Sequence, residues 1–196
     1  NVSLTANGTR TARKDTVYKV NYYLEKLDTT SEKYELVETV TLSGETDTNA
    51  TYEQKTFTGF KYEKTEYDPE NETTILPNGN LIINVYYTRN SYDYTIYHVE
   101  KDNETNVLDT EKGNADFEDV IEVNEKTFTG YAYDSQDKET IVIDVENNVA
   151  YVYYVRNTYS YIVEYYKENL DGNFDKVEDD TTIYEDVTFE SNVAFE

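Results

Sequence analysis

The only histidine of the chain, His98, is the first candidate for chemistry, because an imidazole can act as a general base or bind a metal. A general base needs a second group that positions it, and the sequence offers no evident partner. In the internal alignment described below, His98 falls on Tyr22 and Tyr165, so it occupies a position that is otherwise aromatic. We therefore expect a structural or merely exposed histidine.

Carboxylates are the most abundant reactive groups, with 41 acidic residues. Adjacent pairs such as Glu118-Asp119 and Asp179-Asp180 arise by chance at that density. A glycoside hydrolase needs two carboxyl groups at a defined separation in a cleft, and small tandem β units rarely provide one. We therefore expect no enzyme activity. With no cysteine and a single histidine, transition-metal sites of the usual kind are disfavoured too.

Calcium is the metal that the composition allows, because its protein ligands are oxygen atoms. The segment 171–175 (DGNFD) is similar to a calcium-binding loop, with Asp171 and Asp175 as candidate ligands. It lacks the spacing and the distal Glu of an EF-hand. The alternative is an ordinary turn with solvated acids, and apart from this calcium we expect no cofactor.

Tyrosine is unusually frequent, with 22 residues, and strand alternation divides it between two faces. Tyr18 and Tyr22, together with Tyr87 or Tyr154, fall on the expected core face, where their hydroxyl groups need hydrogen-bond partners. On the opposite parity lie the candidate ligand-binding residues Tyr23, Tyr86, Tyr153 and Tyr166. These four either stack on sugar rings or protein ligands, or cover a sheet face.

The elements that position these residues are repeated in tandem. Residues 56–62 (TFTGFKY) return as residues 127–133 (TFTGYAY), and residues 85–90 (VYYTRN) return as residues 152–157 (VYYVRN). Arrays of one small fold span distance or multiply weak contacts, whereas enzymes seldom need them.

A partial third copy follows at an offset of 67 residues. Tyr94 matches Tyr161, and residues 117–120 match residues 184–187. Phe195 then falls on Phe128, the phenylalanine of the second TFTG motif. Because the chain also lacks an initiating methionine, we expect it to be a fragment of a longer protein.

These matches predict a leader or remnant at 1–16 and three repeats, at 17–91, 92–158 and, in part, 159–196. The joints between copies are one or two residues long. Linkers this short leave little freedom, so we expect an elongated, semi-rigid arrangement.

Each copy is expected to be rich in β-strands. In the first copy, alternation predicts a strand at 18–25 with a hairpin partner at 34–40, and further strands at 60–67 and 81–89. The polar run 45–54 is expected to hold a short helix or an irregular crossover. Since no segment has a long helical period, the predicted fold class is mainly β, that is, β-rich α+β.

The formal net charge is −24, from 17 basic and 41 acidic residues. Nucleic acid and anionic membrane surfaces are disfavoured as partners, because binding to either relies on Lys and Arg. No apolar run is long enough to cross a bilayer, so we expect no membrane insertion in this segment. We expect the isolated chain to be a monomer.

Three motifs recur in a fixed order: Tyr-x-Val-x-Tyr-Tyr at 18–23 and 161–166, Gly-Phe/Tyr-x-Tyr at 59–62 and 130–133, and Val-Tyr-Tyr-x-Arg at 85–89 and 152–156. In this order they resemble the mucin-binding (MucBP) repeats of Gram-positive cell-surface adhesins. The resemblance covers most of the chain and implies tandem ubiquitin-like β-grasp units, with no catalytic residues to transfer. The chain departs from the family where His98 replaces a tyrosine, and where Thr58 and Thr129 replace a frequent proline.

We therefore expect a non-catalytic segment of an extracellular, wall-anchored bacterial adhesin that serves as a stalk or spacer. The alternative is a module that binds host mucin or other glycoprotein glycans, or an immunoglobulin; an accessory domain of a glycoside hydrolase is more distant. Host mucins are commonly acidic, and a strongly acidic chain repels them within a Debye length of about 8 Å, which favours the spacer.

Overall fold

The computed structural model describes residues 11–28 and 30–193, in which there are twelve strands and no helix. The prediction of a mainly β fold is confirmed. The chain divides into two compact units, which we describe separately. The first comprises the residues up to Tyr92 together with 115–119 and 143–146, and the second comprises 93–114, 120–142 and the residues from Asn147 onward.

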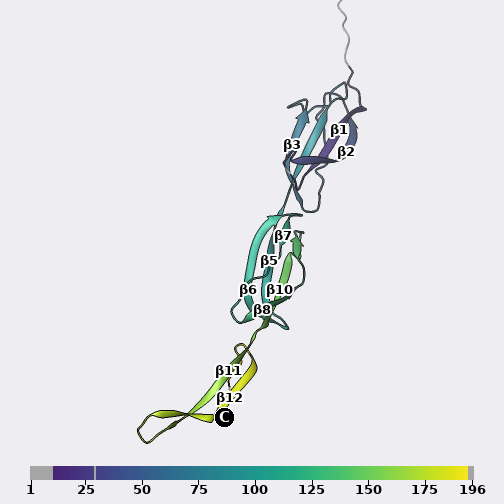
Figure 1. The fold of residues 1–196 in the computed structure, drawn as a ribbon. Coiled ribbons are helices and arrows are strands. Elements are labelled where there is room, and N and C mark those ends of the chain that lie inside the picture. Colours follow the sequence, from purple (N-terminus) through teal and green to yellow (C-terminus); the bar gives the residue numbers. More distant parts are fainter. Residues whose placement is uncertain (1–10, 29, 194–196) are drawn as a thin grey trace, which may run out of the picture. The chain divides into compact units, whose positions relative to one another are not determined.

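Four strands of the first unit form one mixed sheet, in the order β2-β1-β4-β3 (Figure 1). The strands are β1 (Thr16–Glu25), β2 (Tyr34–Gly44), β3 (Phe60–Asp68) and β4 (Ile82–Arg89). The two central strands, β1 and β4, run parallel, and each has an antiparallel neighbour on its other side. The hairpin β1–β2 is thus extended by a strand that arrives from much later in the chain.

A second sheet follows the same plan, in the order β6-β5-β10-β8. Its strands are β5 (Ser91–Glu100), β6 (Asn103–Asp116), β8 (Tyr131–Gln136) and β10 (Val149–Arg156). Again the central pair, β5 and β10, is parallel, and β8 lies antiparallel to β10. The short strands β7 (Val120–Glu122) and β9 (Thr140–Val142) form a separate antiparallel pair.

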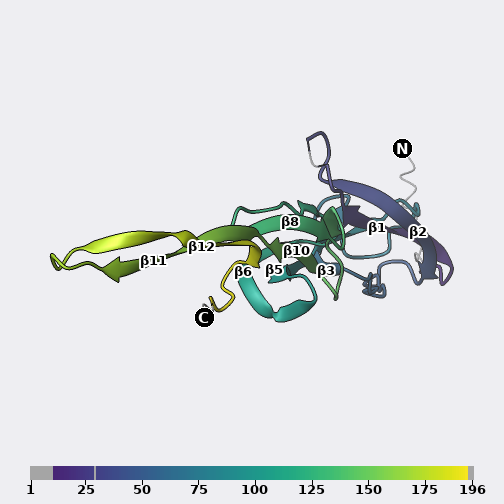
Figure 2. The same cartoon turned by 60° about the horizontal axis from the view of Figure 1, so that its bottom comes forward.

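The last two strands, β11 (Thr158–Glu168) and β12 (Phe174–Thr188), form an antiparallel two-stranded sheet. Figure 2 shows them as a long ribbon with no further strand alongside most of its length. Two-stranded hairpins alone are at best marginally stable in water.

The core of the first unit lies on one face of its sheet, as the alternation predicts. Tyr18, Tyr22 and Tyr87 are each at most 3% exposed, and they pack with buried aliphatic side chains. In the second unit, Tyr154 is fully buried. The predicted core tyrosines are therefore confirmed, since alternation in a half-buried strand assigns faces directly.

The segment 45–54 covers this core without forming a helix, so the irregular crossover is right and the short helix is wrong. Ala50 and Tyr52 pack against the buried cluster, and Asn49 forms an isolated bridge with Thr74. The segment is rich in Thr, Asn and Asp, which compete with helical hydrogen bonds.

Core tyrosines provide hydrogen bonds for this irregular cover. The hydroxyl of Tyr18 donates to the carbonyl oxygen of Thr51 at 2.6 Å, and that of Tyr22 donates to the carbonyl oxygen of Glu53 at 2.7 Å. Buried backbone groups outside regular structure need such partners, because leaving them unpaired costs free energy. The tyrosine-rich core and the irregular cover therefore depend on each other.

In the second unit, His98 takes the place of a core tyrosine, as expected, and it is fully buried. Its Nδ1 lies 3.0 Å from the Tyr154 hydroxyl, and its Nε2 lies 2.7 Å from Glu111 Oε1. The backbone amide of Lys126 donates to Tyr154 Oη at 2.7 Å. A neutral ring protonated on Nε2 satisfies every hydrogen bond in this series: Tyr154 donates to Nδ1, and Nε2–H donates to Glu111.

We predict that His98→Phe destabilises the second unit by about 1–3 kcal/mol, because it leaves the buried Tyr154 hydroxyl and Glu111 without the imidazole. His98→Tyr fills nearly the same volume, and we expect it to cost less, since its hydroxyl can repeat the bond that Tyr22 makes in the first unit. Urea unfolding followed by NMR at Val152, with Val85 as the internal control in the first unit, measures both. Equal stability of His98→Phe and wild type would show that the imidazole hydrogen bonds contribute nothing.

Candidate ligand-binding surfaces and repeat joints

Two of the candidate ligand-binding residues, Tyr23 and Tyr86, lie side by side on the outer face of the first sheet. Their ring centroids are 4.9 Å apart and their planes differ by 18°, so they stack. Tyr34 packs at a tilt against Tyr86, also at 4.9 Å. The Lys64 ammonium lies 5.1 Å from the Tyr86 ring centroid, in a cation–π contact.

These contacts leave Tyr23 and Tyr86 half-buried. Burial raises the pKa of Tyr86 to about 12, with Glu66 and Tyr23 adding to the shift. The rings thus cover the sheet face and offer only part of their surface to a ligand.

A row of polar side chains crosses the same outer face. Thr39 on β2 donates to Asn21 on β1 at 2.8 Å, and the Asn21 amide donates to Asn84 on β4 at 3.0 Å. The row ties the two central strands to β2 by side chains as well as by the backbone ladder. It also places amide groups next to aromatic rings, a combination suited to sugar hydroxyl groups.

Tyr153 lies on the second sheet, in a shallow groove of about 510 Å³. The groove is also lined by Lys101, Asp102, Glu104 and Ser135. Tyr153 stacks with Tyr151, with centroids 6.3 Å apart. Because the Lys101 ammonium is paired with Asp134 at 2.7 Å, the remaining carboxylates give the groove an acidic character. Such a groove fits neutral or cationic groups better than anionic ones.

Tyr166 lies on β11 and is 55% exposed, and its hydroxyl donates to Glu164 at 3.0 Å. The four candidate tyrosines therefore do not form one strip: Tyr23 and Tyr86 are in contact, whereas Tyr153 and Tyr166 lie on two other sheets. Their role in ligand binding stays a prediction.

Of the two candidate calcium ligands, Asp171 lies in the turn between β11 and β12, and Asp175 is the second residue of β12. Asn169 organises this turn: its Oδ1 accepts from the amides of Asp171 and Asn173, and its Nδ2 donates to Asp175 at 3.0 Å. One oxygen of the Asp175 carboxylate is thus already bonded. Within 11–28 and 30–193, no group of three or more His, Asp or Glu side chains is arranged to hold a metal ion. Calcium binding stays a prediction.

The TFTG turn of the first repeat has a structural role that the sequence did not assign. Gly59 has a φ of +81°, and a Cβ there would overlap the ring of Phe117. The Phe117 ring also meets Phe60 edge-on at 5.7 Å, and its amide donates to the carbonyl oxygen of Asn90 at 2.8 Å. The glycine therefore provides both the turn and the space for the aromatic ring.

The arginine that ends the Val-Tyr-Tyr-x-Arg motif of the first repeat, Arg89, binds the backbone of the same phenylalanine. Arg89 donates from Nη1 to the carbonyl oxygen of Phe117 at 3.0 Å and to the carboxylate of Asp119. Its side chain is only 9% exposed. A charge-assisted bond in such a partly buried place is stronger than a surface ion pair.

The second unit contains an equivalent set of contacts between consecutive copies, and from here on we call each of these two sets of contacts a joint. Gly130 has a φ of +80°, and a Cβ there would overlap the ring of Phe189. Phe189 meets Tyr131 edge-on at 5.9 Å, and its amide donates to the carbonyl oxygen of Asn157 at 2.9 Å. Glycine, aromatic ring and asparagine carbonyl thus recur in the same arrangement.

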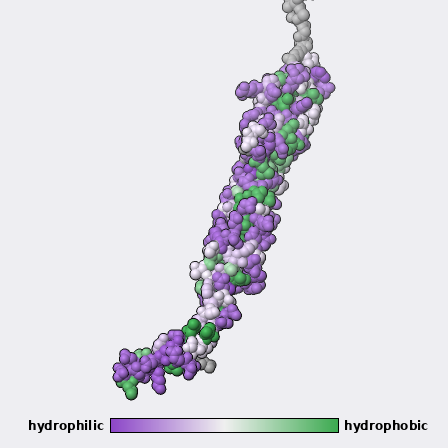
Figure 3. Space-filling model, viewed as in Figure 1, coloured by the Kyte–Doolittle hydropathy of each residue, from purple (hydrophilic) through white to green (hydrophobic). Residues whose placement is uncertain are grey.

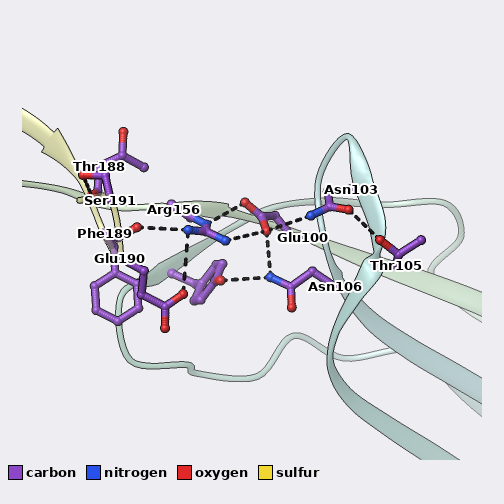
Figure 4. A network of polar contacts seen from close by, with 10 residues as sticks. Glu100, Asn103, Thr105, Asn106, Arg156, Thr188, Phe189, Glu190 and Ser191 are labelled. Carbon is purple, nitrogen blue, oxygen red and sulfur yellow. Dashed lines mark hydrogen bonds and ion pairs between the residues drawn. The ribbon is translucent and has the colours of Figure 1, made fainter.

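Figure 4 shows the arginine of this second joint, Arg156. It donates to the carbonyl oxygen of Phe189 at 3.2 Å, and it also binds both carboxylate oxygens of Glu100, at 2.8 and 3.2 Å. Glu190 lies 3.7 Å away. The Arg156 guanidinium, helped by Asn106, holds the pKa of Glu100 below its ordinary value of 4.5.

The joints correct one alignment made from the sequence. Phe117 was expected to match Tyr184, but it is Phe189 whose amide and ring make the contacts that Phe117 makes. The hairpin β11–β12 of the third copy is therefore longer than the hairpin β5–β6 of the second, so the offset of 67 residues does not hold along the whole copy. The expected match of Phe195 with Phe128 lies outside the described residues. A phenylalanine followed by an acidic residue, Phe-Glu in both copies, was the signal that could have identified the joint.

Comparison with protein-family models gives no match, and comparison with curated proteins gives none either. Among solved structures, the chain is similar to the type 2 repeat of the mucus binding protein MUB from Lactobacillus reuteri. The likeness covers 72% of this chain and 100% of that one, with 10% sequence identity and a TM-score of 0.28. A score of this size does not establish a shared fold. In the described residues, no helix is long and apolar enough to span a membrane.

We predict that Gly59→Ala destabilises the first unit more than Gly79→Ala does. Both glycines have positive φ, so both substitutions carry a backbone cost of about 1–2 kcal/mol. Only at Gly59 does the new methyl group also overlap a ring, which adds about 1–3 kcal/mol, whereas at Gly79 it meets ordinary contacts of 3.4 Å.

Urea unfolding of the single variants and of each combined with Phe117→Ala gives the coupling energy. We expect coupling between Gly59→Ala and Phe117→Ala and none with Gly79→Ala. Equal effects of the two glycine substitutions in the presence of Phe117 would contradict the proposed fit of ring and turn.

Proposed function

We propose that the chain is a non-catalytic segment of a bacterial cell-surface adhesin, in which small β units of one kind follow one another as a semi-rigid stalk or spacer. The observation that carries this proposal is the recurrence of the joint. Phe117 and Phe189 meet the same set of partners: a left-handed glycine, an edge-on ring, an asparagine carbonyl and an arginine.

What recurs between the copies is mostly scaffold. The Phe57 and Tyr87 rings meet edge-on at 4.9 Å, and Phe128 and Tyr154 repeat that contact at the same distance. The outer faces differ in where a tyrosine pair stacks across the parallel strands: the pair is Tyr23 with Tyr86 in the first sheet and Tyr97 with Tyr151 in the second. Tyr153, which corresponds to Tyr86, is paired with Val99. A chain that repeats its joints and varies its faces is suited to a mechanical role.

The sheet plan supports β-grasp-like units in particular. Each of the two four-stranded sheets has a central parallel pair flanked by antiparallel strands. This agrees with the resemblance to mucin-binding repeats, which also motivates the proposed extracellular, wall-anchored location in a Gram-positive bacterium.

A second candidate function is direct binding of host glycoprotein through the groove at Tyr153. Figure 3 shows a face of the molecule that is mostly hydrophilic with small apolar patches, and the net charge is −24. A ligand in this groove is therefore a neutral sugar, a basic protein surface or an acidic glycan bridged by calcium. The unpaired carboxylates can accept hydrogen bonds from sugar hydroxyl groups, and the ring can stack on a sugar.

We predict that small-angle scattering of the 196-residue chain at physiological salt gives the radius of gyration of an elongated particle. A compact protein of this length has a radius of gyration of about 16 Å, and we expect a clearly larger value. The measurement at several protein concentrations excludes association as the cause. A value near that of a compact globule would contradict the stalk.

We predict that, in the series with chelator, any retention on mucin or on a glycan array is confined to neutral glycans. Tyr153→Ala is expected to reduce this retention about tenfold, the loss expected when about 1.4 kcal/mol of ring stacking is removed. Tyr133→Ala is the matched control, since Tyr133 is 42% exposed and lies on the neighbouring strand outside this groove. Chelator is added in a parallel series to reveal calcium bridges. No retention under any condition favours the spacer alone, and retention that both variants leave unchanged excludes the groove.

A further inference from the structure

We infer that a second groove of the second unit, beside the edge strand β8, binds an extended basic segment of another protein. The segment has lysine or arginine at alternate positions, contains no acidic residue and adds to β8 as a further strand. This groove shares only Ser135 with the groove at Tyr153. The inference does not depend on whether the chain binds glycans or serves as a spacer.

The groove, which we call the β8 groove, has a volume of about 680 Å³ and is lined by residues 122–125 and 133–139. Its two sides are tied together at Val123, which is only 4% exposed. The Val123 amide donates to the carbonyl oxygen of Glu139 at 2.9 Å, and its own carbonyl oxygen accepts from Gln136 Nε2 at 3.2 Å. The β8 groove is therefore a fixed part of the folded unit.

The edge of β8 is open along this groove. β8 is the last strand of its sheet, and in the described part of the chain it pairs with β10 alone. The backbone groups of an antiparallel strand point alternately toward its partner and away from it. Gly130 accepts from the residue that follows β10, and Asp137 donates to β10, so both point toward that strand. Counted from these two ends across the bulge in β8, Tyr133 and Gln136 point their amides away from β10. Such an edge is a template for another strand.

The first unit shows how this position can be closed. At the offset of 71 residues that relates the two TFTG turns, Tyr52 corresponds to Val123 and Thr65 corresponds to Gln136. The Tyr52 hydroxyl lies 2.7 Å from Thr65 Oγ1, so one side chain reaches from the irregular crossover to the edge strand β3. A valine is too short to do this, and the second unit is left with a groove that ligand side chains can enter.

Charge selects a basic occupant for the β8 groove. Asp134 is paired with Lys101, and Asp137 lies 3.9 Å from Lys138, the only basic residue of the lining. The other acidic side chains of the lining are exposed and take part in no ion pair within the described residues; they are Glu122, Glu125 and Glu139. A strand with cationic side chains neutralises these carboxylates, whereas an acidic strand is repelled.

The corresponding edge of the first unit disfavours the same occupant. β3 has Lys61 and Lys64 at the positions of Ala132 and Ser135 in β8. The two edges therefore differ in charge as well as in the closing tyrosine, and the first unit serves as an internal reference. At β8, main-chain bonds supply affinity, and the alternate lysines or arginines supply specificity.

The test is hydrogen exchange of the full 196-residue chain with a synthetic peptide of the sequence TKVKVKT, blocked at both ends. We expect exchange at the amides of Tyr133 and Gln136 to slow at least about tenfold as the peptide saturates the chain. The corresponding amides of β3, at Tyr62 and Thr65, should not change. A peptide of the same composition with its lysines in one block, TVVKKKT, should give no protection, because its charges do not alternate along a strand.

Variants separate the groove from the general charge of the chain. Glu122→Gln combined with Glu125→Gln should weaken peptide binding about fivefold, the loss expected for two exposed ion pairs. Asp179→Asn combined with Asp180→Asn is the matched control, because it removes the same charge from exposed positions of β12 and should leave binding unchanged. Val123→Tyr, which copies the first unit, should abolish the protection without any change of charge.

The amide signal of Val152 verifies that the second unit of each variant is folded, and the two glutamine substitutions decide the matter if Val123→Tyr is not. Unchanged exchange at saturating peptide, equal protection by the block peptide, equal protection of the β3 amides, or equal weakening by the two double variants would each overturn the inference. Protection without peptide that rises with chain concentration would overturn the assignment to another protein, because a second copy would then occupy the edge.

Discussion

The structure depends on one constraint: a sheet whose core face is covered by chain without regular secondary structure. A helix satisfies its own backbone, but segment 45–54 does not, and its peptide groups lie against a buried cluster. The hydroxyl groups of Tyr18 and Tyr22 reach across the core and bond carbonyl oxygens of Thr51 and Glu53. Leucine or valine could fill the space but could not provide these bonds. Tyrosine at these two positions therefore compensates for the missing helix.

The same reasoning explains how a histidine can occupy a tyrosine position. In the second unit, His98 lies between the Tyr154 hydroxyl and Glu111, and the Lys126 ammonium lies 3.0 Å from that carboxylate. In the first unit, Tyr22 lies beneath the Lys55 ammonium, which is paired with Glu38. Both positions therefore combine a buried ring with a lysine–glutamate ion pair next to it. The ring is a phenol in one unit and an imidazole in the other, while the neighbouring ion pair is kept.

Alternation along the strands predicted which tyrosines are buried, because in a sheet with one covered face it decides burial directly. It also placed Tyr23 and Tyr86 on one outer face. Of the two alternatives predicted for 45–54, the short helix was wrong. The length and polarity of a segment do not distinguish a helix from an irregular crossover whose backbone hydrogen bonds come from distant side chains. The groove at Tyr153 depends on Lys101 pairing with Asp134, two residues 33 positions apart, and no local pattern encodes that pair. The offset that matched Phe117 to Tyr184 failed because a hairpin can lengthen without changing its strands, so only the bonds of Phe189 identified the joint.

Charge links this scaffold to its surface. The cations at the joints and beside His98 form ion pairs within their own unit: Arg89 with Asp119, Arg156 with Glu100, and Lys126 with Asp109 and Glu111. Each such pair neutralises a carboxylate together with a cation, so the excess of 41 acidic over 17 basic residues stays on carboxylates that are not offset. The outer faces of the units are therefore anionic. A partner of these repeats has to tolerate that field or be attracted by it, and chains of the same kind are kept from associating through their faces.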